Sequence, residues 1–385
     1  MRGLATMRLT AFEIAVLHLR QPSGGGRPDL PINIGGGRNL LVKVTDERGL
    51  CGWGESSPRV GIRGESVETA KGLLHEQILP PLLGLELDNF EQAAAAMERL
   101  LGGLDPLQLA AFCAAELAVL DLAGRRFGVA ACEILGRPRR DSVHYSGSID
   151  ASDPEVVRDQ AAILRRRGVG SVRIRMGVDL TRNLQRLDIA RQILGEEVAL
   201  LIDPEQRWDS AQALQQLKAM AGFHLAGVEQ PVPAADLEGM QRITAAGLAP
   251  VIAAGRVQTR QDVERLAETG GCDSISIRIA HCGGLHGAGR VHAAARTAGL
   301  GCLLGAPRQE IGLLGAAGRQ FGTRAEGLTW MDECAALARS ESAICEPNVT
   351  AGPGGVAPPL PGPGLGTTPH TERIEPLLRQ KISVH

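Results

Sequence analysis

The stretch between residues 171 and 203, SVRIRMGVDLTRNLQRLDIARQILGEEVALLID, contains the unit that decides the fold of this chain. It starts with SVRIRM (171–176) and ends with VALLID (198–203), two short aliphatic runs of the kind that form buried strands. Between them, apolar residues recur at the spacing of a helix that buries one face: Leu180, Leu184, Leu187, Ala190 and Leu194. The stretch therefore predicts a strand, a helix and a second, parallel strand.

The same unit recurs from residue 143 onward. A helix is predicted after the first strand because Ser152 or Asp153 can cap its start, Pro154 suits its first turn and Gly168 suits its end. Eight units favour an α/β fold of the (β/α)8 type, a modified TIM barrel, over an open doubly wound sheet. Because the eighth predicted strand is short, the sequence does not decide whether the barrel closes. The predicted strands are VHYSGSI (143–149), SVRIRM (171–176), VALLID (198–203), AGVEQ (226–230), PVIAA (250–254), SISIRI (274–279), GCLLG (301–305) and GLTWM (327–331).

The chain outside the barrel does not repeat the strand-and-helix pattern. RLTAFEIAVLHL (8–19) and NLLVKVTDERGLCGWGE (39–55) read as antiparallel strands, and a long helix is predicted from residue 106. We therefore expect an α+β capping domain over residues 1–135, the barrel over 141–346, and a segment at 347–385 that returns to the capping domain. The glycine-rich stretch 21–39 is predicted to be a lid over the substrate, since no helix follows it to form a phosphate cradle.

Composition narrows the class of function. The net charge is −2 and the pI is near 6.5, which argues against nucleic acid and anionic membrane surfaces as partners. Eight cysteines without a CxxC pair, and no signal peptide, predict a cytoplasmic protein. We expect no apolar run to be long enough to cross a membrane.

Charged residues stand at the predicted strand ends. Arg173 and Arg175 share one face of the second strand because side chains alternate along a strand. Asp203 ends the third strand, Glu229 the fourth and Arg278 the sixth. Taken singly, such a carboxylate can cap a helix or pair with a neighbouring arginine. Together they predict a site, because the C-terminal ends of barrel strands carry the chemistry of this fold.

Several motifs resemble the enolase superfamily, and within it the muconate-lactonising and mandelate racemase branch. The resemblance runs over nearly the whole length of the chain. It implies a capping domain on a modified barrel, Mg²⁺ held by three acidic residues on successive strands, removal of a proton next to a carboxylate, and a homo-oligomer. The motifs are GWGESSP (52–58), AELAVLDLAGRRFGVAACEILG (115–136), HCGGLHGAGRVHAAARTAGL (281–300) and GPGLG (362–366).

The chain departs from that branch at the proton-transferring positions. Where relatives carry a Lys-x-Lys pair it has Arg173 and Arg175, and Arg278 stands in place of the opposing lysine. A lysine, with a pKa of ~10.4, can be tuned to act as a base, whereas removing the proton of arginine at pH 7 costs about 9 kcal/mol. We therefore expect the arginines to be catalytic by holding anionic charge. His281, three residues after Arg278, is a candidate acid or base.

The predicted metal site is incomplete. Asp203 and Glu229 match the first two ligands, but the third position reads Gly255, followed by Arg256. A guanidinium from Arg256 beside the two carboxylates would take the place of the cation. Glu205 could instead restore a ligand or pair with an arginine, so that either no cofactor or Mg²⁺ is compatible with the sequence.

These residues predict an enzyme acting on a small carboxylate metabolite by isomerase, cycloisomerase or lyase chemistry. Substrate contacts are expected from Arg256 and Glu205, and from Arg308 and Glu310 after the seventh strand. Two alternatives stay open: a conventional Mg²⁺-dependent enzyme in which Glu205 completes the site, and an inactive barrel kept as a binding or assembly protein.

Overall fold

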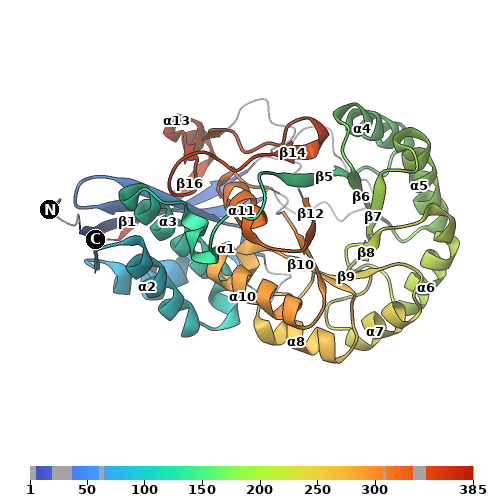
Figure 1. Cartoon of the computed structure of the whole chain (residues 1–385), viewed down its shortest axis with the longest axis horizontal. Helices are drawn as coiled ribbons and strands as arrows, with labels where there is room; N and C mark the ends of the chain where they lie inside the picture. Colours follow the sequence, from blue (N-terminus) through green and yellow to red (C-terminus); the bar gives the residue numbers. More distant parts are fainter. Residues whose placement is uncertain (1–5, 20–36, 60–64, 307–308, 333–343, 385) are drawn as a thin grey trace.

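The computed structural model describes residues 6–19, 37–59, 65–306, 309–332 and 344–384. A barrel of parallel strands, ringed by helices, occupies one side of the molecule, and an α+β capping domain occupies the other (Figure 1). The predicted fold class is confirmed. The barrel strands are β5 (Val143–Ile149), β6 (Ser171–Arg175), β7 (Ala199–Asp203), β8 (Gly227–Glu229), β9 (Val251–Ala253), β10 (Ser274–Ile277), β11 (Gly301–Leu304) and β12 (Leu328–Asp332).

The eight strands form a closed barrel. They follow one another in sequence order, and β12 pairs in parallel with β5 through Met331 with Tyr145 and Asp332 with Ser146. The short eighth strand is thus long enough to complete the ring. Farther toward the start of β5, the two-residue strand β14 (Val356–Ala357) adds an antiparallel pairing.

Helices cover the outside of the barrel (Figure 1). The first begins where its sequence predicts, because Asp153 accepts hydrogen bonds from the backbone N–H groups of Glu155 and Val156, and it ends at Gly168 in the left-handed region at φ 74°. The helices of the ring are α4 (Pro154–Arg167), α5 (Leu180–Leu194), α6 (Ser210–Ala219), α7 (Leu237–Ala245), α8 (Arg260–Glu268), α9 (Ile279–Cys282), α10 (Gly284–Thr297) and α11 (Leu313–Arg324).

The barrel interior is packed with side chains. Leu201, Ile252 and Leu303 form a buried cluster of their own, separate from the main core between strands and helices. Because side chains alternate, the residues two positions farther along these strands also face inward, toward the C-terminal mouth. The interior register therefore identifies which polar residues lie at the mouth.

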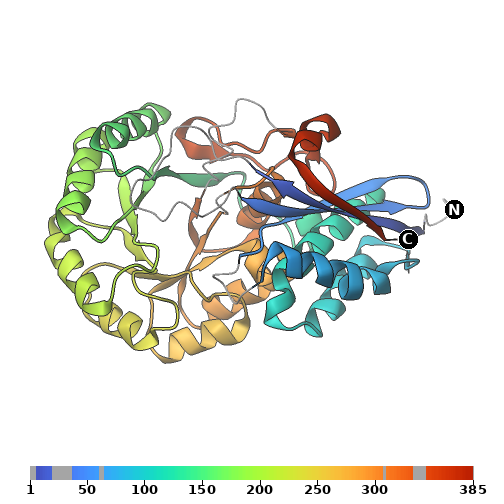
Figure 2. The same cartoon turned by 180° about the vertical axis from the view of Figure 1, so that it is seen from behind.

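The capping domain is an antiparallel sheet packed against helices. Its strands lie in the order β16 (Leu378–Val384), β1 (Met7–His18), β2 (Arg38–Asp46) and β3 (Cys51–Ser56), and β4 (Glu86–Leu87) pairs with the start of β1. Viewed from behind, the last strand, in red, runs alongside the first, in dark blue (Figure 2). The C-terminal segment thus completes the sheet that the N-terminal segment begins. The remaining helices and strands are α1 (Val67–Leu73), α2 (Phe90–Gly102), α3 (Leu109–Phe127), β13 (Cys345–Glu346), β15 (Thr368–Pro369) and α13 (Thr371–Ile374).

The glycines of the GWGES motif allow α3 to approach β3 closely. A Cβ atom at Gly52 would lie 2.3 Å from the carbonyl oxygen of Ala118, and one at Gly54 would lie 2.0 Å from that of Ala114. Both contacts are far shorter than van der Waals distances permit. Larger residues at these positions would push the helix off the sheet.

The helical segment Pro106–Phe127 is long and apolar enough to cross a membrane by length and composition, so the expectation that no segment reaches that length is wrong. The most apolar 18-residue stretch of this segment is 89% buried inside the protein. The apolar residues therefore serve packing against the capping sheet and the barrel.

Two buried glutamates of the capping domain join it to the barrel. Glu116 of α3 accepts hydrogen bonds from His286 Nδ1 at 2.7 Å and from the backbone N–H groups of Leu285 and His286 at the start of α10. Glu55 of β3 accepts a hydrogen bond from the backbone N–H of Ile311, just before α11. Carboxylates at helix N-termini are favoured by the helix dipole, so these contacts hold the cap over the barrel.

Candidate active site at the barrel mouth

A cluster of arginines and carboxylates occupies the C-terminal mouth of the barrel. Glu229, at the end of β8, lies between two guanidinium groups: its Oε2 atom is 3.0 Å from Arg173 Nη1, and its Oε1 atom is 2.9 Å from Arg278 Nη2. Arg173 is on β6 and Arg278 directly follows β10, so the predicted residues of three strands do meet.

Asp332 joins this cluster from the last residue of β12. Its Oδ2 atom lies 2.7 Å from Arg173 Nη1, so one guanidinium nitrogen bridges Asp332 and Glu229. Sequence reasoning missed Asp332 because the eighth strand was predicted to end at Met331. Extending that strand by one residue would have placed a carboxylate at its end.

Arg175 faces a second group of carboxylates. Its Nε atom lies 2.6 Å from Asp150 Oδ1, and its Nη1 atom donates to Glu205 Oε1 at 2.6 Å. Glu205 is also 3.0 Å from Arg207 Nη2. Of the two roles considered for Glu205, pairing with an arginine is the one seen. Asp150, which directly follows β5, is a second residue that sequence reasoning missed.

The charges set the protonation states of the cluster. Burial raises the pKa of Asp332 to about 6, although Arg173 opposes the rise. Burial and the neighbouring charge of Glu229 also raise the pKa of Asp203. Glu229 behaves in the opposite way, because Arg173 and Arg278 outweigh its burial and lower its pKa.

The arginines stay protonated. Burial alone would lower the pKa of Arg173, but the carboxylates of Asp332 and Glu229 raise it well above its ordinary value. The pKa of Arg175 is likewise raised by the carboxylates of Asp150 and Glu205, against the effect of burial. Neither side chain can accept a proton from a substrate near neutral pH.

Two guanidinium nitrogens of the cluster lack a hydrogen-bond acceptor among the described residues. Arg173 Nε and Arg278 Nε are buried, and within the part of the chain that the structure describes no atom accepts a hydrogen bond from either of them. Gly305 leaves room for one of these side chains, since a Cβ atom there would lie 3.1 Å from Arg278 Nε. A buried donor without an acceptor is costly, so an oxygen of a bound ligand would stabilise this arrangement.

His281 lies beside the cluster and is neutral. Burial, followed by the positive charges of Arg278 and Arg59, lowers its pKa to about 3, against the effect of a hydrogen bond with the Ser57 backbone. The hydrogen bond with Ser57 brings the capping domain to the barrel rim. A histidine with so low a pKa is a weak base near neutral pH.

Comparisons with known proteins identify the family of this chain. Residues 156–373 match the family described as enolase C-terminal domain-like, and residues 34–136 match the mandelate racemase / muconate lactonizing enzyme N-terminal domain. The chain belongs to the mandelate racemase and muconate lactonizing branch of the enolase superfamily.

Named relatives in this superfamily are isomerases. Muconate cycloisomerase 1 of Rhodococcus opacus is 30% identical over 343 residues, which cover 87% of this chain and 90% of the relative. L-Ala-D/L-Glu epimerase of Bacillus subtilis is 28% identical over 283 residues, 72% of this chain and 76% of the relative. The crystal structure of N-succinyl Arg/Lys racemase from Bacillus cereus superposes with a TM-score of 0.85 at 21% identity, covering 98% of this chain and all of that one, which shows the shared fold.

The third metal-ligand position expected from the resemblance lies just after β9, where this chain has no carboxylate. A Cβ atom at Gly255 would lie 2.4 Å from the Cβ atom of Ala234, on the helix side of the strand. Ile252 packs inside the barrel, so alternation directs Ala254 toward the mouth. The inward position is thus Ala254, one residue earlier than the sequence predicted, and alanine has no oxygen to offer a metal.

The residues present do not fit a magnesium ion in this arrangement. Both carboxylate oxygens of Glu229 are engaged by arginines, and Asp203 Oδ1 accepts a hydrogen bond from the backbone N–H of Glu205 at 2.8 Å. Within the described residues, no three or more His, Cys, Asp or Glu side chains form a group that could hold a metal ion.

The other predicted substrate contacts lie elsewhere. Arg256 is exposed and lines a cavity together with residues of α7 and α8, outside the Asp203 and Glu229 cluster. It therefore does not take the place of the cation beside Asp203 and Glu229. Glu310 is buried close to Gly315 of α11, where an added Cβ atom would lie 2.8 Å from its Oε1 atom. Arg308 and residues 21–36 of the predicted lid lie outside the described residues.

The loops that follow the acidic strand ends have unusual backbones. Glu205 and Gln206, just after β7, have positive φ angles of 55° and 63°, and Gln230, just after β8, has a φ angle of 40°. Such conformations are strained for residues other than glycine and persist where the surroundings enforce them. They concentrate around the charged cluster, as expected for a functional site.

Proposed function

We propose that this chain is an isomerase of a small carboxylate metabolite that works without a divalent metal ion. The observation that carries the proposal is the guanidinium of Arg173, which bridges Glu229 and Asp332 at 3.0 and 2.7 Å. A permanent cation thus stands among the carboxylates of the barrel mouth. Its charge supplies part of the electrostatic stabilisation that a metal would give to an anion.

The arginines are proposed to hold the substrate. Arg173 Nε and Arg278 Nε each have a hydrogen to donate, and Arg278 is the more accessible of the two, with 25% of its side chain exposed. A substrate carboxylate oxygen placed against them would receive charge-assisted hydrogen bonds. The same donors would stabilise negative charge that develops on that carboxylate during the reaction.

Asp332 is proposed to move the proton. Its pKa of about 6 lets it hold or release a proton close to neutral pH, which is the property of an efficient general acid or base. The arginines are too basic for this role and His281 is too acidic. In the step proposed, the Asp332 carboxylate takes a proton from substrate carbon, the C–H electron pair moves onto the substrate carboxylate, and the proton then returns to the carbon skeleton.

Solvent exchange tests this proposal. The full-length protein is incubated in deuterium oxide with a panel of dicarboxylates and N-acyl amino acids, and loss of the proton next to the carboxylate is followed by NMR. With a chelator present, we expect exchange that rises with pH around a midpoint near 6. Asp332→Asn should abolish it, whereas Arg260→Ala, on an exposed ion pair of α8, should leave it unchanged.

The other outcomes identify the alternatives. Exchange that appears only after Mg²⁺ is added would reject the metal-free proposal in favour of a conventional superfamily enzyme. The second candidate, an inactive barrel that only binds a ligand, is favoured by the extent of internal charge pairing. Four guanidinium groups form ion pairs with four carboxylates of the protein: Arg173, Arg175, Arg207 and Arg278 with Asp150, Glu205, Glu229 and Asp332. Binding of panel members without any exchange would select it.

We also propose a cytoplasmic location and a homo-oligomeric state. The seven described cysteines are all free thiols, which is typical of a reducing compartment. Light scattering of the purified chain would test the oligomeric state.

A further inference from the structure

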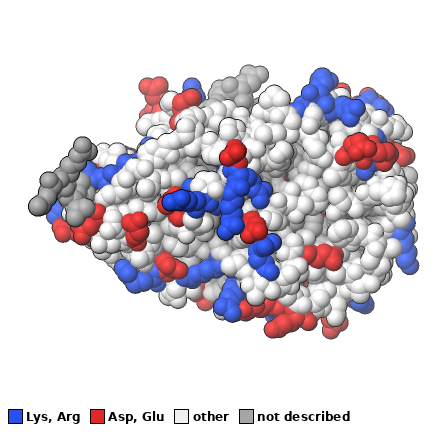
Figure 3. Space-filling model, in the orientation of Figure 1, with Lys and Arg blue, Asp and Glu red and all other residues white. Residues whose placement is uncertain are grey.

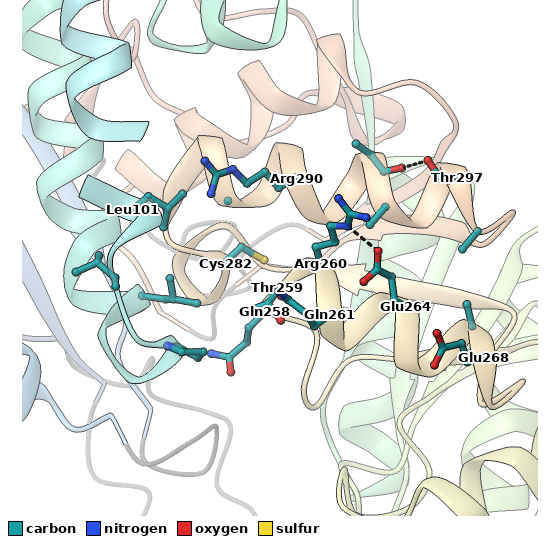
Figure 4. A pocket seen from close by; sticks show the side chains of 18 residues that line it. Leu101, Gln258, Thr259, Arg260, Gln261, Glu264, Glu268, Cys282, Arg290 and Thr297 are labelled. Carbon is teal, nitrogen blue, oxygen red and sulfur yellow. Dashed lines mark hydrogen bonds and ion pairs between the residues drawn. The ribbon is translucent and has the colours of Figure 1, made fainter. Parts of the chain in front are cut away.

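Two of the cavities outside the barrel mouth are lined by arginines, and the pairing of these arginines differs between the two. The larger, of about 790 Å³, is formed by α8, α10 and the turn between α2 and α3 (Figure 4). Its cations are already neutralised: Arg260 lies 2.6 Å from Glu264, and Arg290 lies 3.1 Å from Glu98. This cavity therefore offers an anionic ligand no unpaired cation among its described lining residues.

The smaller cavity, of about 270 Å³, lies between α7 and α8. Arg256 and Arg265 both line it and are both exposed. Unlike most arginines of the described chain, neither side chain makes a hydrogen bond or an ion pair with another described residue. Two unpaired guanidinium groups therefore border one small cavity.

The local structure explains why both arginines are placed here. Gln230 Oε1 accepts hydrogen bonds from the backbone N–H groups of Ala254 and Gly255 at 2.9 and 2.8 Å, which holds the turn that carries Arg256 outward. On α8, Val263 and Leu266 are buried against the barrel, so the intervening Arg265 remains at the surface. The turn after β9 and the helix α8 thus place Arg256 and Arg265 beside the same cavity.

The single carboxylate in the lining does not balance these charges. Asp262 Oδ2 accepts hydrogen bonds from Thr259 Oγ1 and from the backbone N–H groups of Gln258 and Thr259, which commits it to capping α8. The rest of the described lining is largely apolar, with Leu237, Met240 and Leu266 as its larger side chains. The cavity thus combines net positive charge with an apolar wall.

We propose that this cavity binds a small organic oxyanion, with its carboxylate or phosphate held by Arg256 and Arg265. Guanidinium groups bind such oxyanions through paired hydrogen bonds, and an apolar body would rest against Leu237, Met240 and Leu266. The site is separate from the barrel mouth, so it does not depend on the proposed isomerase activity. It adjoins the mouth through Gln230, which lines the cavity and directly follows Glu229.

Calorimetric titration of the full-length protein at low ionic strength tests this site. Benzoate serves as the carboxylate probe with an apolar body, and inorganic phosphate as the probe without one. We expect Arg256→Ala combined with Arg265→Ala to weaken binding of the preferred probe at least tenfold. Arg260→Ala is the matched control, because Arg260 lies on the same helix but lines the other cavity and is paired with Glu264.

Each result has a defined meaning. Tighter binding of benzoate supports a site for carboxylates with an apolar body, and tighter binding of phosphate supports a site for phosphate esters. Failure of the wild-type protein to bind either probe at millimolar concentration would overturn the proposal. So would equal affinity in the wild-type and double-variant proteins, which would assign the anion to another site such as the barrel mouth. Unfolding curves of both variants establish that the exposed substitutions leave the fold intact.

Discussion

Arg173 Nη1 lies 2.7 Å from Asp332 Oδ2, an ion pair that joins the second and eighth strands of the barrel across the first. The same nitrogen lies 3.0 Å from Glu229, so one buried cation serves two carboxylates. The barrel mouth is therefore held by charge as well as by backbone pairing. The consequences for stability can be measured independently of any reaction.

Removing this cation should destabilise the protein strongly. Arg173→Ala leaves Glu229 and Asp332 buried with less compensation, and breaking a buried ion pair costs about 3–5 kcal/mol. Urea unfolding of the variant measures the loss. Arg260→Ala is the control, since its exposed pair with Glu264 should contribute less than about 1 kcal/mol. Equal effects of the two substitutions would show that the Arg173 bridge does not stabilise the barrel.

The close approach at Gly255 predicts a second effect. Gly255→Ala would place a Cβ atom 2.4 Å from that of Ala234, and overpacking of this kind costs about 1–3 kcal/mol. Gly222→Ala is the matched control, because a Cβ atom there would meet nothing within 4 Å. A thermal shift confined to Gly255→Ala is expected. An unshifted Gly255→Ala variant would mean that the turn after β9 relaxes freely.

Glu65 should make stability depend on pH. It is buried at the start of α3, where it accepts hydrogen bonds from the backbone N–H groups of Ala110 and Ala111, and burial raises its pKa to about 7. The folded protein therefore binds this proton more tightly than the unfolded chain does. The resulting stabilisation is complete below pH 4.5 and is lost as the pH rises toward 7, by up to about 3 kcal/mol.

Glu65→Gln tests that dependence, because the amide keeps the shape of the side chain and does not ionise. Unfolding free energies between pH 5 and 7 should fall less steeply in the variant than in the wild-type protein. Glu68→Gln is the control: Glu68 pairs with Arg38, which lowers its pKa below this range, so the slope should persist. A wild-type slope in Glu65→Gln would assign the pH dependence to another group.

The junction between the domains predicts an energetic coupling. Glu116 and His286 are joined by a hydrogen bond of 2.7 Å between α3 and α10. Each of Glu116→Gln and His286→Ala should destabilise the protein, by about 1.5–3 kcal/mol for a charged hydrogen bond. The double variant should lose less than the sum of the two, because each single change already removes the shared contact. Additive losses in urea unfolding would show that the two residues act independently.

Local patterns were sufficient to predict much of this architecture. The strands and helices of the barrel follow from short aliphatic runs, apolar residues at helical spacing, and caps such as Asp153 and Gly168. These signals depend on neighbours in the chain, which is why they can be read from sequence. The meeting of Arg173, Glu229 and Arg278 was also predictable, because strand ends of a barrel converge.

The register of the strand ends and the packing of the helices could not be predicted from those local patterns. Asp332 enters the cluster because β12 continues one residue farther than expected and closes against β5. The turn after β9 directs Ala254 inward and Arg256 outward, since Gln230 binds the backbone of that turn.

The sequence by itself determined the order of strands and helices, the barrel class, and which charged residues stand at strand ends, because periodicity and capping act between residues close together in the chain. Only the tertiary structure decided which charges neutralise one another and which arginines remain open to a ligand. Those outcomes depend on side-chain directions between segments far apart in sequence, where a shift of one residue turns a side chain from the barrel interior to its outer face.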